Sequence, residues 1–151
     1  MRKADWFVKF FLAVAFTASS AVCLIAQPQP CSNIPYLHQN KFDPQPLELH
    51  RVQGAALDQN GKPVAQLCLG LFSTPDHKLM RFAQADRNGN FSLDTHDLPD
   101  GEYRLVGQLI GFCPANAIID INSHFRHKKP LVVHMNLPGT DTCSYVELRK
   151  K

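Results

Sequence analysis

Short runs of alternating apolar and polar residues fill most of the chain, and turn-forming residues separate them. A period of two bounded by Gly, Pro, Asn and Asp indicates β-strands. No window shows a convincing helical period. Short strands at close spacing predict an all-β fold with two packed sheets. We expect seven strands, at about residues 49–57, 64–72, 79–85, 90–94, 102–109, 116–121 and 131–137.

The alternation also predicts which side chains face the core. Cys68 and Phe72 of the second predicted strand point away from the core. The side chains of that strand that point inward are Ala65, Leu67, Leu69 and Leu71. One face of the first predicted strand carries His50, Val52, Gly54 and Ala56.

Two Asp-x-Asn-Gly segments, DQNG at 58–61 and DRNG at 86–89, separate predicted strands. Asn followed by Gly suits the positive φ angles of tight turns, and an Asp side chain accepts hydrogen bonds from the turn backbone. A calcium loop of the EF-hand type needs further oxygen ligands and a closing Glu, which neither segment supplies. We therefore expect both segments to be turns.

The order of these motifs resembles a known domain family. A Gly-bearing strand is followed by DQNG, Pro63-Val64, a second strand, DRNG-x-Phe and then Pro-x-Gly-x-Tyr-x-Leu from Pro99 to Leu105. This order resembles the carboxypeptidase regulatory-like domain, over about Val52 to Leu137. The resemblance implies a seven-stranded Greek-key β-sandwich that is transthyretin-like (prealbumin-like, a carbohydrate-binding-like fold), in a bacterial exported protein.

The composition along the chain predicts four segments. Residues 1–26 read as a signal peptide, with basic residues before an apolar run and small residues after it. A Pro-rich arm follows at 27–46, then the sandwich at 47–138 and a C-terminal tail at 139–151. Cleavage after Ala21 or after Ala26 is compatible with the pattern. Cleavage after Ala26 is favoured over cleavage after Ala21 because it leaves an even number of cysteines. A lipoprotein at Cys23 is disfavoured because Val22 stands where Gly or Ala is needed, and an uncleaved anchor because the apolar run is too short for a span.

Four cysteines in an exported chain predict two disulfides. The strand directions of the inferred topology place Cys113 and Cys143 at the same end of the sandwich, so we expect them to pair. Cys68 lies on the outward face of its strand, where the Pro-rich arm can cover it, so we expect Cys31 to pair with Cys68. Four cysteines allow three connectivities, and the other two stay open at this point.

The sequence offers little for catalysis or metal binding. The formal net charge is +3, and part of it lies in the predicted signal, so the chain lacks the basic footprint of a nucleic-acid binder. His124 and His127 are close in sequence, but no third ligand has suitable spacing, so no metal site and no cofactor is expected. Ser144, with His134 and Asp141 nearby in sequence, lies in an irregular segment that fixes no catalytic geometry.

We therefore expect a non-catalytic exported binding or accessory module, periplasmic or extracellular, whose partner is a carbohydrate or a cell-envelope protein. No membrane span is expected after signal cleavage. Loops at one end of the sandwich are the expected site. The richest loop carries positive charge around one aromatic ring, in His124, Phe125, Arg126, His127, Lys128 and Lys129.

Two alternatives stay open. One is a small hydrolase of the 5-hydroxyisourate hydrolase type, which the resemblance suggests by fold. Those enzymes end in a Tyr-Arg-Gly-Ser-type tail, whereas this chain ends in CSYVELRKK. The other is a purely structural envelope domain with no soluble ligand.

Overall fold

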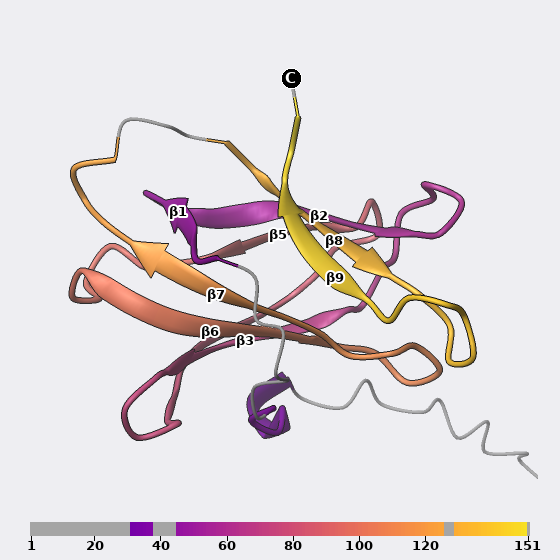
Figure 1. Cartoon of the computed structure of the whole chain (residues 1–151), viewed down its shortest axis with the longest axis horizontal. Coiled ribbons are helices and arrows are strands. Elements are labelled where there is room, and N and C mark those ends of the chain that lie inside the picture. The colour runs from indigo at the N-terminus through magenta and orange to yellow at the C-terminus, as the bar shows by residue number, and fades with distance from the viewer. Residues whose placement is uncertain (1–30, 38–44, 126–128, 151) are drawn as a thin grey trace, which may run out of the picture.

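The computed structural model of the protein describes residues 31–37, 45–125 and 129–150. These residues form two β-sheets that pack face to face (Figure 1). The first sheet has five strands, in the order β1 (Leu47–Leu49), β7 (Ala115–Ile121), β6 (Gly101–Gln108), β3 (Cys68–Ser73) and β4 (Leu79–Gln84). The second has four, in the order β5 (Asn90–Leu93), β2 (Val52–Asp58), β8 (Leu131–Met135) and β9 (Tyr145–Leu148). Most neighbours are antiparallel, but β1 with β7 and β2 with β8 are parallel.

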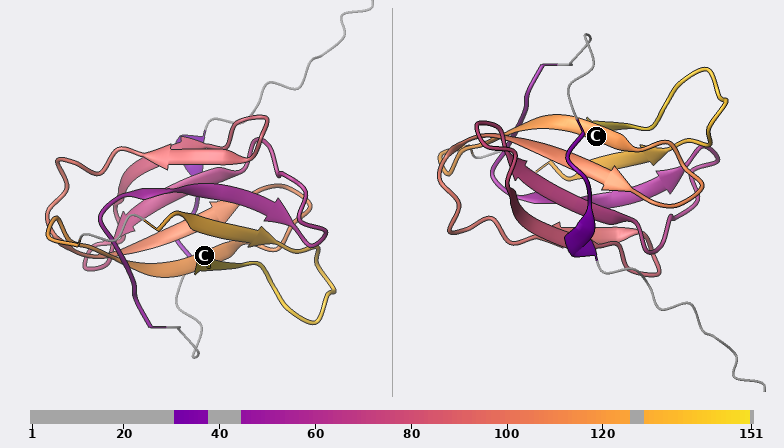
Figure 2. Two further views of the ribbon diagram at one scale, coloured as in Figure 1. Left: turned by 90° about the horizontal axis from the view of Figure 1, so that it is seen from above. Right: turned by 90° about the horizontal axis from the view of Figure 1, so that it is seen from below.

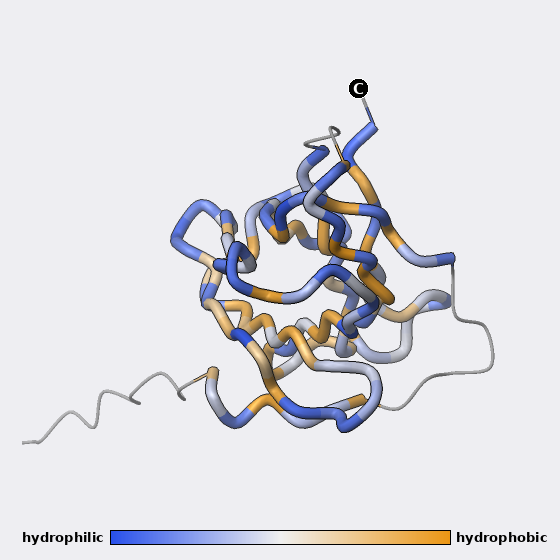
Figure 3. Tube along the Cα trace, turned by 90° about the vertical axis from the view of Figure 1, so that its left-hand side faces the viewer, coloured by the Kyte–Doolittle hydropathy of each residue, from blue (hydrophilic) through white to orange (hydrophobic). Residues whose placement is uncertain are grey.

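The core lies between the sheets and follows the predicted alternation. Leu67, Leu69 and Leu71 are fully buried, as predicted, whereas Ala65 is only half-buried. Leu131 and Val133 of β8 face them from the other sheet and are also fully buried. Figure 3 shows the result along the chain, with hydrophobic positions inside and hydrophilic turns outside.

Nine strands are present in the described residues, two more than the seven predicted. The predicted strand at 49–57 is divided at His50 and Arg51, where the chain bends from β1 in one sheet to β2 in the other. His50 therefore does not share the face of β2 with Val52. The other additional strand is β9, within the residues assigned to a tail. Its four residues are too few to show a period of two against their surroundings.

The N-terminal arm covers the outer face of the five-stranded sheet. The short 3-10 helix η1 (Cys31–Asn33) begins a segment that crosses this face (Figure 2). Cys31 forms a disulfide with Cys68, as predicted, and Ile34 packs on Phe72 and Val106. Both faces of this sheet are thus covered, which is why five consecutive residues of β6, Tyr103 to Gly107, are buried without alternation.

The two Asp-x-Asn-Gly segments are turns, as predicted. Asp58 Oδ1 accepts hydrogen bonds from the backbone N–H groups of Asn60 and Lys62, at 2.8 Å each. These bonds hold the pKa of Asp58 below its usual value, and the bond from Lys62 has the largest effect. Asp86 Oδ1 bonds the equivalent N–H groups of its own turn, and Gly89 has a φ of 75°.

Candidate ligand-binding cleft

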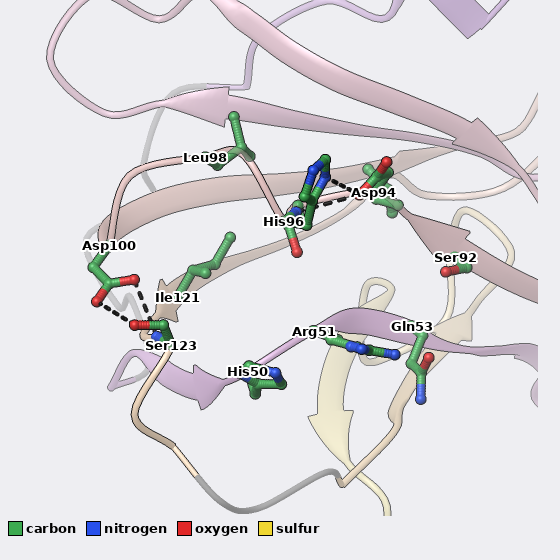
Figure 4. A pocket seen from close by; sticks show the side chains of 12 residues that line it. His50, Arg51, Gln53, Ser92, Asp94, His96, Leu98, Asp100, Ile121 and Ser123 are labelled. Carbon is green, nitrogen blue, oxygen red and sulfur yellow. Dashed lines mark hydrogen bonds and ion pairs between the residues drawn. The ribbon is translucent and has the colours of Figure 1, made fainter.

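A cleft of about 510 Å³ opens at one end of the sandwich (Figure 4). Strands β2 and β5 stay paired as far as Val52 and Leu93, and there they part. On one side the chain bends through residues 50–51 to β1, and on the other residues 94–100 cross to β6. Because Leu49 pairs with Ile121, the end of β7 reaches the same place. The cleft is the space between these diverging segments.

Three segments supply the lining, and it is mixed in character. Apolar contact comes from Leu93, Leu98 and Ile121, which are buried parts of the core edge. The polar and charged lining residues are His50, Arg51, Gln53, Ser92, Asp94, Thr95, His96, Asp100 and Ser123.

Two carboxylates of the cleft are held in place by hydrogen bonds. Asp100 accepts two from Ser123, one from the backbone N–H and one from the hydroxyl, at 3.0 Å each. Asp94 Oδ1 accepts one from the His96 backbone N–H at 3.2 Å and lies 3.1 Å from His96 Nδ1. The backbone bond is the main cause that lowers the pKa of Asp94. Both groups are therefore fixed in orientation and keep acceptor capacity for a ligand.

The segment 94–100 is anchored to β4 by one arginine. Arg81 Nε donates to the Asp94 carbonyl oxygen at 3.1 Å, and its Nη2 lies 2.5 Å from Asp97 Oδ1. This bond from Arg81 is the largest cause that lowers the pKa of Asp97. Arg81 thus holds one wall of the cleft, although it does not line it.

Other polar groups of the cleft have no partner in the described part of the chain. His50 Nδ1 is buried and makes no hydrogen bond there. The exposed Arg51 side chain, which lines the cleft beside Gln53, likewise has no hydrogen bond or ion pair among the described residues. Figure 4 shows both residues on the same stretch of chain, across the cleft from Asp94 and His96. Among the described residues, the lining therefore has an unpaired guanidinium in Arg51 and, in the buried part of His50, a ring nitrogen without a partner.

The described part of the predicted basic loop begins beside this cleft. His124 follows the lining residue Ser123, its side chain is 89% exposed, and its Nδ1 lies 3.9 Å from Asp100 Oδ2. Phe125 is half-buried and Lys129 is exposed. The other members of the predicted site, Arg126, His127 and Lys128, lie outside the described residues.

The sequence pattern did not indicate the remaining cleft residues. His50 and His96 are 46 positions apart and line the same cleft only because β2 pairs with β5. Asp94 and Asp100 belong to a segment that reads as an ordinary polar connection. The cleft is apparent only in the fold. There the pairing of β2 with β5 ends next to both the bend at residues 50–51 and the segment 94–100.

The residues considered for catalysis lie elsewhere and bond to other groups. The Ser144 hydroxyl donates to the Cys113 carbonyl oxygen at 2.6 Å and accepts from the Asn136 backbone N–H at 2.8 Å. His134 stacks on Tyr145 with ring centroids 4.5 Å apart, and its Nε2 lies 3.1 Å from Glu147. Ser144 and His134 are thus engaged in separate networks.

No group of three or more His, Cys, Asp or Glu residues able to hold a metal ion occurs in residues 31–37, 45–125 and 129–150. Within the same ranges no helix has the length and apolar character needed to span a bilayer.

Neither a protein-family model nor a curated protein matches this chain. Its function is therefore inferred from the chemistry of the cleft.

Proposed function

We propose that this protein is an exported, non-catalytic binding module whose ligand occupies the end cleft. The ligand class is a carbohydrate or another polyhydroxylated component of the cell envelope. The observation that carries the proposal is the buried His50 Nδ1, which has no hydrogen-bond partner in the described chain. A buried polar atom without a partner is unfavourable in a folded protein. The His50 ring lines the cleft, so a rotation of the ring that brings Nδ1 to a ligand hydroxyl group would satisfy it.

The other cleft groups suit the same ligand class. A sugar hydroxyl both donates and accepts hydrogen bonds, and the cleft has acceptors in Asp94 and Asp100 and donors in Arg51 and Gln53. Leu98 and Ile121 offer apolar contact to the C–H groups of a sugar ring. A volume of about 510 Å³ lies in the range of small-molecule sites.

Export is supported by the cysteines. The Cys31–Cys68 disulfide is compatible with an oxidising compartment, periplasmic or extracellular, as the predicted signal at residues 1–26 requires. The signal itself lies outside the described residues.

The finer fold assignment is also a proposal. We infer a transthyretin-like Greek-key sandwich of the carboxypeptidase regulatory-like type. Three features support it: the chain crosses repeatedly between the two sheets, β2 lies parallel to β8, and both Asp-x-Asn-Gly turns lie at one end of the sandwich.

Calorimetric titration with glucose, galactose, N-acetylglucosamine and galacturonic acid tests the proposal. Arg51→Gln should weaken binding of the preferred sugar about tenfold, because it removes a charged donor. His50→Phe keeps the ring shape but removes the orphaned nitrogen. It should raise Tm without ligand and lower affinity for the sugar, a pair of opposite effects that a merely structural histidine would not give.

Arg87→Gln is the matched control. Arg87 is an exposed arginine in the turn before β5, at the end of that strand remote from the cleft, so its loss should leave affinity unchanged. A protein that binds none of the four sugars, or binds one equally well in all variants, would contradict the proposal.

The predicted basic loop gives the experiment a second arm. If His124 to Lys129 contact an acidic glycan, binding of polygalacturonate should be stronger at about pH 5.5 than at about pH 7.5, because imidazoles gain charge in this range. Changing Arg126, Lys128 and Lys129 to Ala should weaken it at both pH values. Equal binding by both proteins at both values would eliminate the loop as a contact.

A further inference from the structure

Two thiols meet at the end of the sandwich opposite the cleft. Cys113 follows the turn after β6, and Cys143 lies in the loop between β8 and β9. The sequence predicted a disulfide between them, but in this structure both cysteines are free, with their Sγ atoms 2.7 Å apart. Non-bonded heavy atoms attract each other best at separations of about 3.5 Å or more, so this contact is unfavourably short. A covalent bond between the two sulfurs would relieve this contact without moving the loops apart.

Backbone hydrogen bonds hold the two loops in this position. The Cys113 N–H donates to the Asn136 carbonyl oxygen at 2.8 Å, and the Ser144 hydroxyl donates to the Cys113 carbonyl oxygen at 2.6 Å. The Asn136 side-chain amide donates to the carbonyl oxygens of Thr142 and Cys143, at 3.0 and 3.3 Å. The approach of the sulfurs is therefore a fixed feature of this end of the fold.

We propose that Cys113 and Cys143 form a reversible, solvent-accessible cystine that clamps the edge strand β9, and that it is reduced before Cys31–Cys68. Cys143 is exposed and Cys113 is half-exposed. In the other pair, Cys31 is only 6% exposed and packs with Ile34 of the arm and with Phe72, and Cys68 is half-buried. A reductant must reach a sulfur in order to attack it, so the two bridges differ in reactivity.

The clamp acts on the part of the fold with the fewest other constraints. Strand β9 has four residues and pairs only with β8, at the edge of its sheet. Its N-terminal connection is the loop that carries Cys143. Opening the bridge therefore frees this connection, whereas the central strands keep partners on both sides.

The chemistry is thiol–disulfide exchange with a disulfide-bearing oxidant, such as glutathione disulfide. The Cys143 thiolate attacks the oxidant, forms a mixed disulfide and releases one thiolate. The Cys113 thiolate then attacks the Cys143 sulfur and releases the second. The two cysteines lose two protons and two electrons, and the oxidant becomes two thiols. Cys143 is the first nucleophile because it is exposed, and because its hydrogen bond raises the pKa of the Cys113 thiol.

Graded reduction of the protein produced in an oxidising compartment tests the proposal. The oxidised protein is equilibrated with increasing dithiothreitol, its free thiols are alkylated, and each cysteine is quantified by peptide mapping. We expect Cys113 and Cys143 to be labelled together at about tenfold lower reductant than Cys31 and Cys68. Hydrogen exchange at that reductant level should be faster in the amides of β9 and unchanged in those of β6.

The experiment needs no substitution, so a variant that fails to fold does not affect it. The double variant Cys113→Ser/Cys143→Ser adds a permanently open clamp, which should show the fast β9 exchange at every reductant level. Alkylation of Cys113 and Cys143 before any reductant is added would overturn the proposal. Release of the Cys31–Cys68 bridge first, or unchanged exchange in β9, would also overturn it.

Discussion

Gly54 is a residue whose identity is fixed by the backbone of a neighbouring strand. It lies in β2 opposite Leu131 of the parallel strand β8. A Cβ atom at this position would lie 2.0 Å from the Leu131 carbonyl oxygen. Because this oxygen belongs to the backbone, no side-chain movement can relieve the clash. The glycine therefore permits the close approach of β2 and β8 that the four-stranded sheet requires.

The variant Gly54→Ala should lose at least about 3 kcal/mol of unfolding free energy, because the two central strands must separate to admit the methyl group. Gly107→Ala is the control. Gly107 also lies in a strand, but a Cβ there meets its nearest atom, Ala115 Cβ, at an ordinary 3.6 Å. Its unfolding free energy should change by no more than about 1 kcal/mol. Urea denaturation of both variants measures this, and equal losses would contradict the close-approach explanation.

Among the elements, the sequence predicted the strands that have one buried face and one more exposed face. The strands in which buried residues alternate with more exposed ones, such as β5 and β7, were recognised by this alternation. Strand β9 was not, because four half-exposed residues carry little pattern. The bend at His50 was missed for a different reason: the alternation runs on through the point where the chain changes sheets.

The cleft was unpredicted because it depends on the arrangement of elements and on no motif. Among the described residues, the loop expected to be the site begins at His124, next to the lining residue Ser123, and supplies none of the lining itself. The Cys31–Cys68 pairing was predicted correctly because it needed only one fact, that Cys68 points outward from its strand. The cleft needed three segments to be placed at once.

The ion pair between Arg81 and Asp97 anchors the segment 94–100 and gives a prediction at this scale. The pKa of Asp97 is lowered in the folded protein, so its charged form stabilises the fold above the unfolded pKa. This contribution is lost as the pH falls through the lowered folded value. Asp97→Asn should therefore lower Tm at neutral pH, by no more than a few degrees because the pair is partly exposed.

The difference in Tm between wild type and Asp97→Asn should shrink as the pH falls through the lowered pKa of Asp97, and vanish where the wild-type carboxyl is also neutral. Asp141→Asn is the control, since Asp141 is exposed in the β8–β9 loop and far from Arg81 in the fold. Thermal melts across the pH range measure both. A difference for Asp97→Asn that persists unchanged at acid pH would show that lost packing, and not lost charge, is responsible.

At the scale of the whole molecule, the sandwich separates two sites of different chemistry. Asp100 of the cleft directly precedes β6, and the turn leading to Cys113 follows the other end of that strand. The eight residues of β6 span roughly 25 Å at about 3.3 Å per residue. Between the ends, β6 is hydrogen-bonded to β3 and β7 and buried on both faces. Such a strand has no second arrangement that would carry a change from one end to the other.

The proposed cystine and the proposed ligand site should therefore be energetically independent. The affinity for the preferred sugar should differ by less than about twofold between the oxidised protein and the Cys113→Ser/Cys143→Ser variant, as for distant sites without shared partners. Titration calorimetry of the two proteins, with Arg51→Gln added to each, completes a double-mutant cycle. A coupling free energy above about 0.5 kcal/mol would contradict independence and would mean that β9, through its contacts with β7, links the two ends.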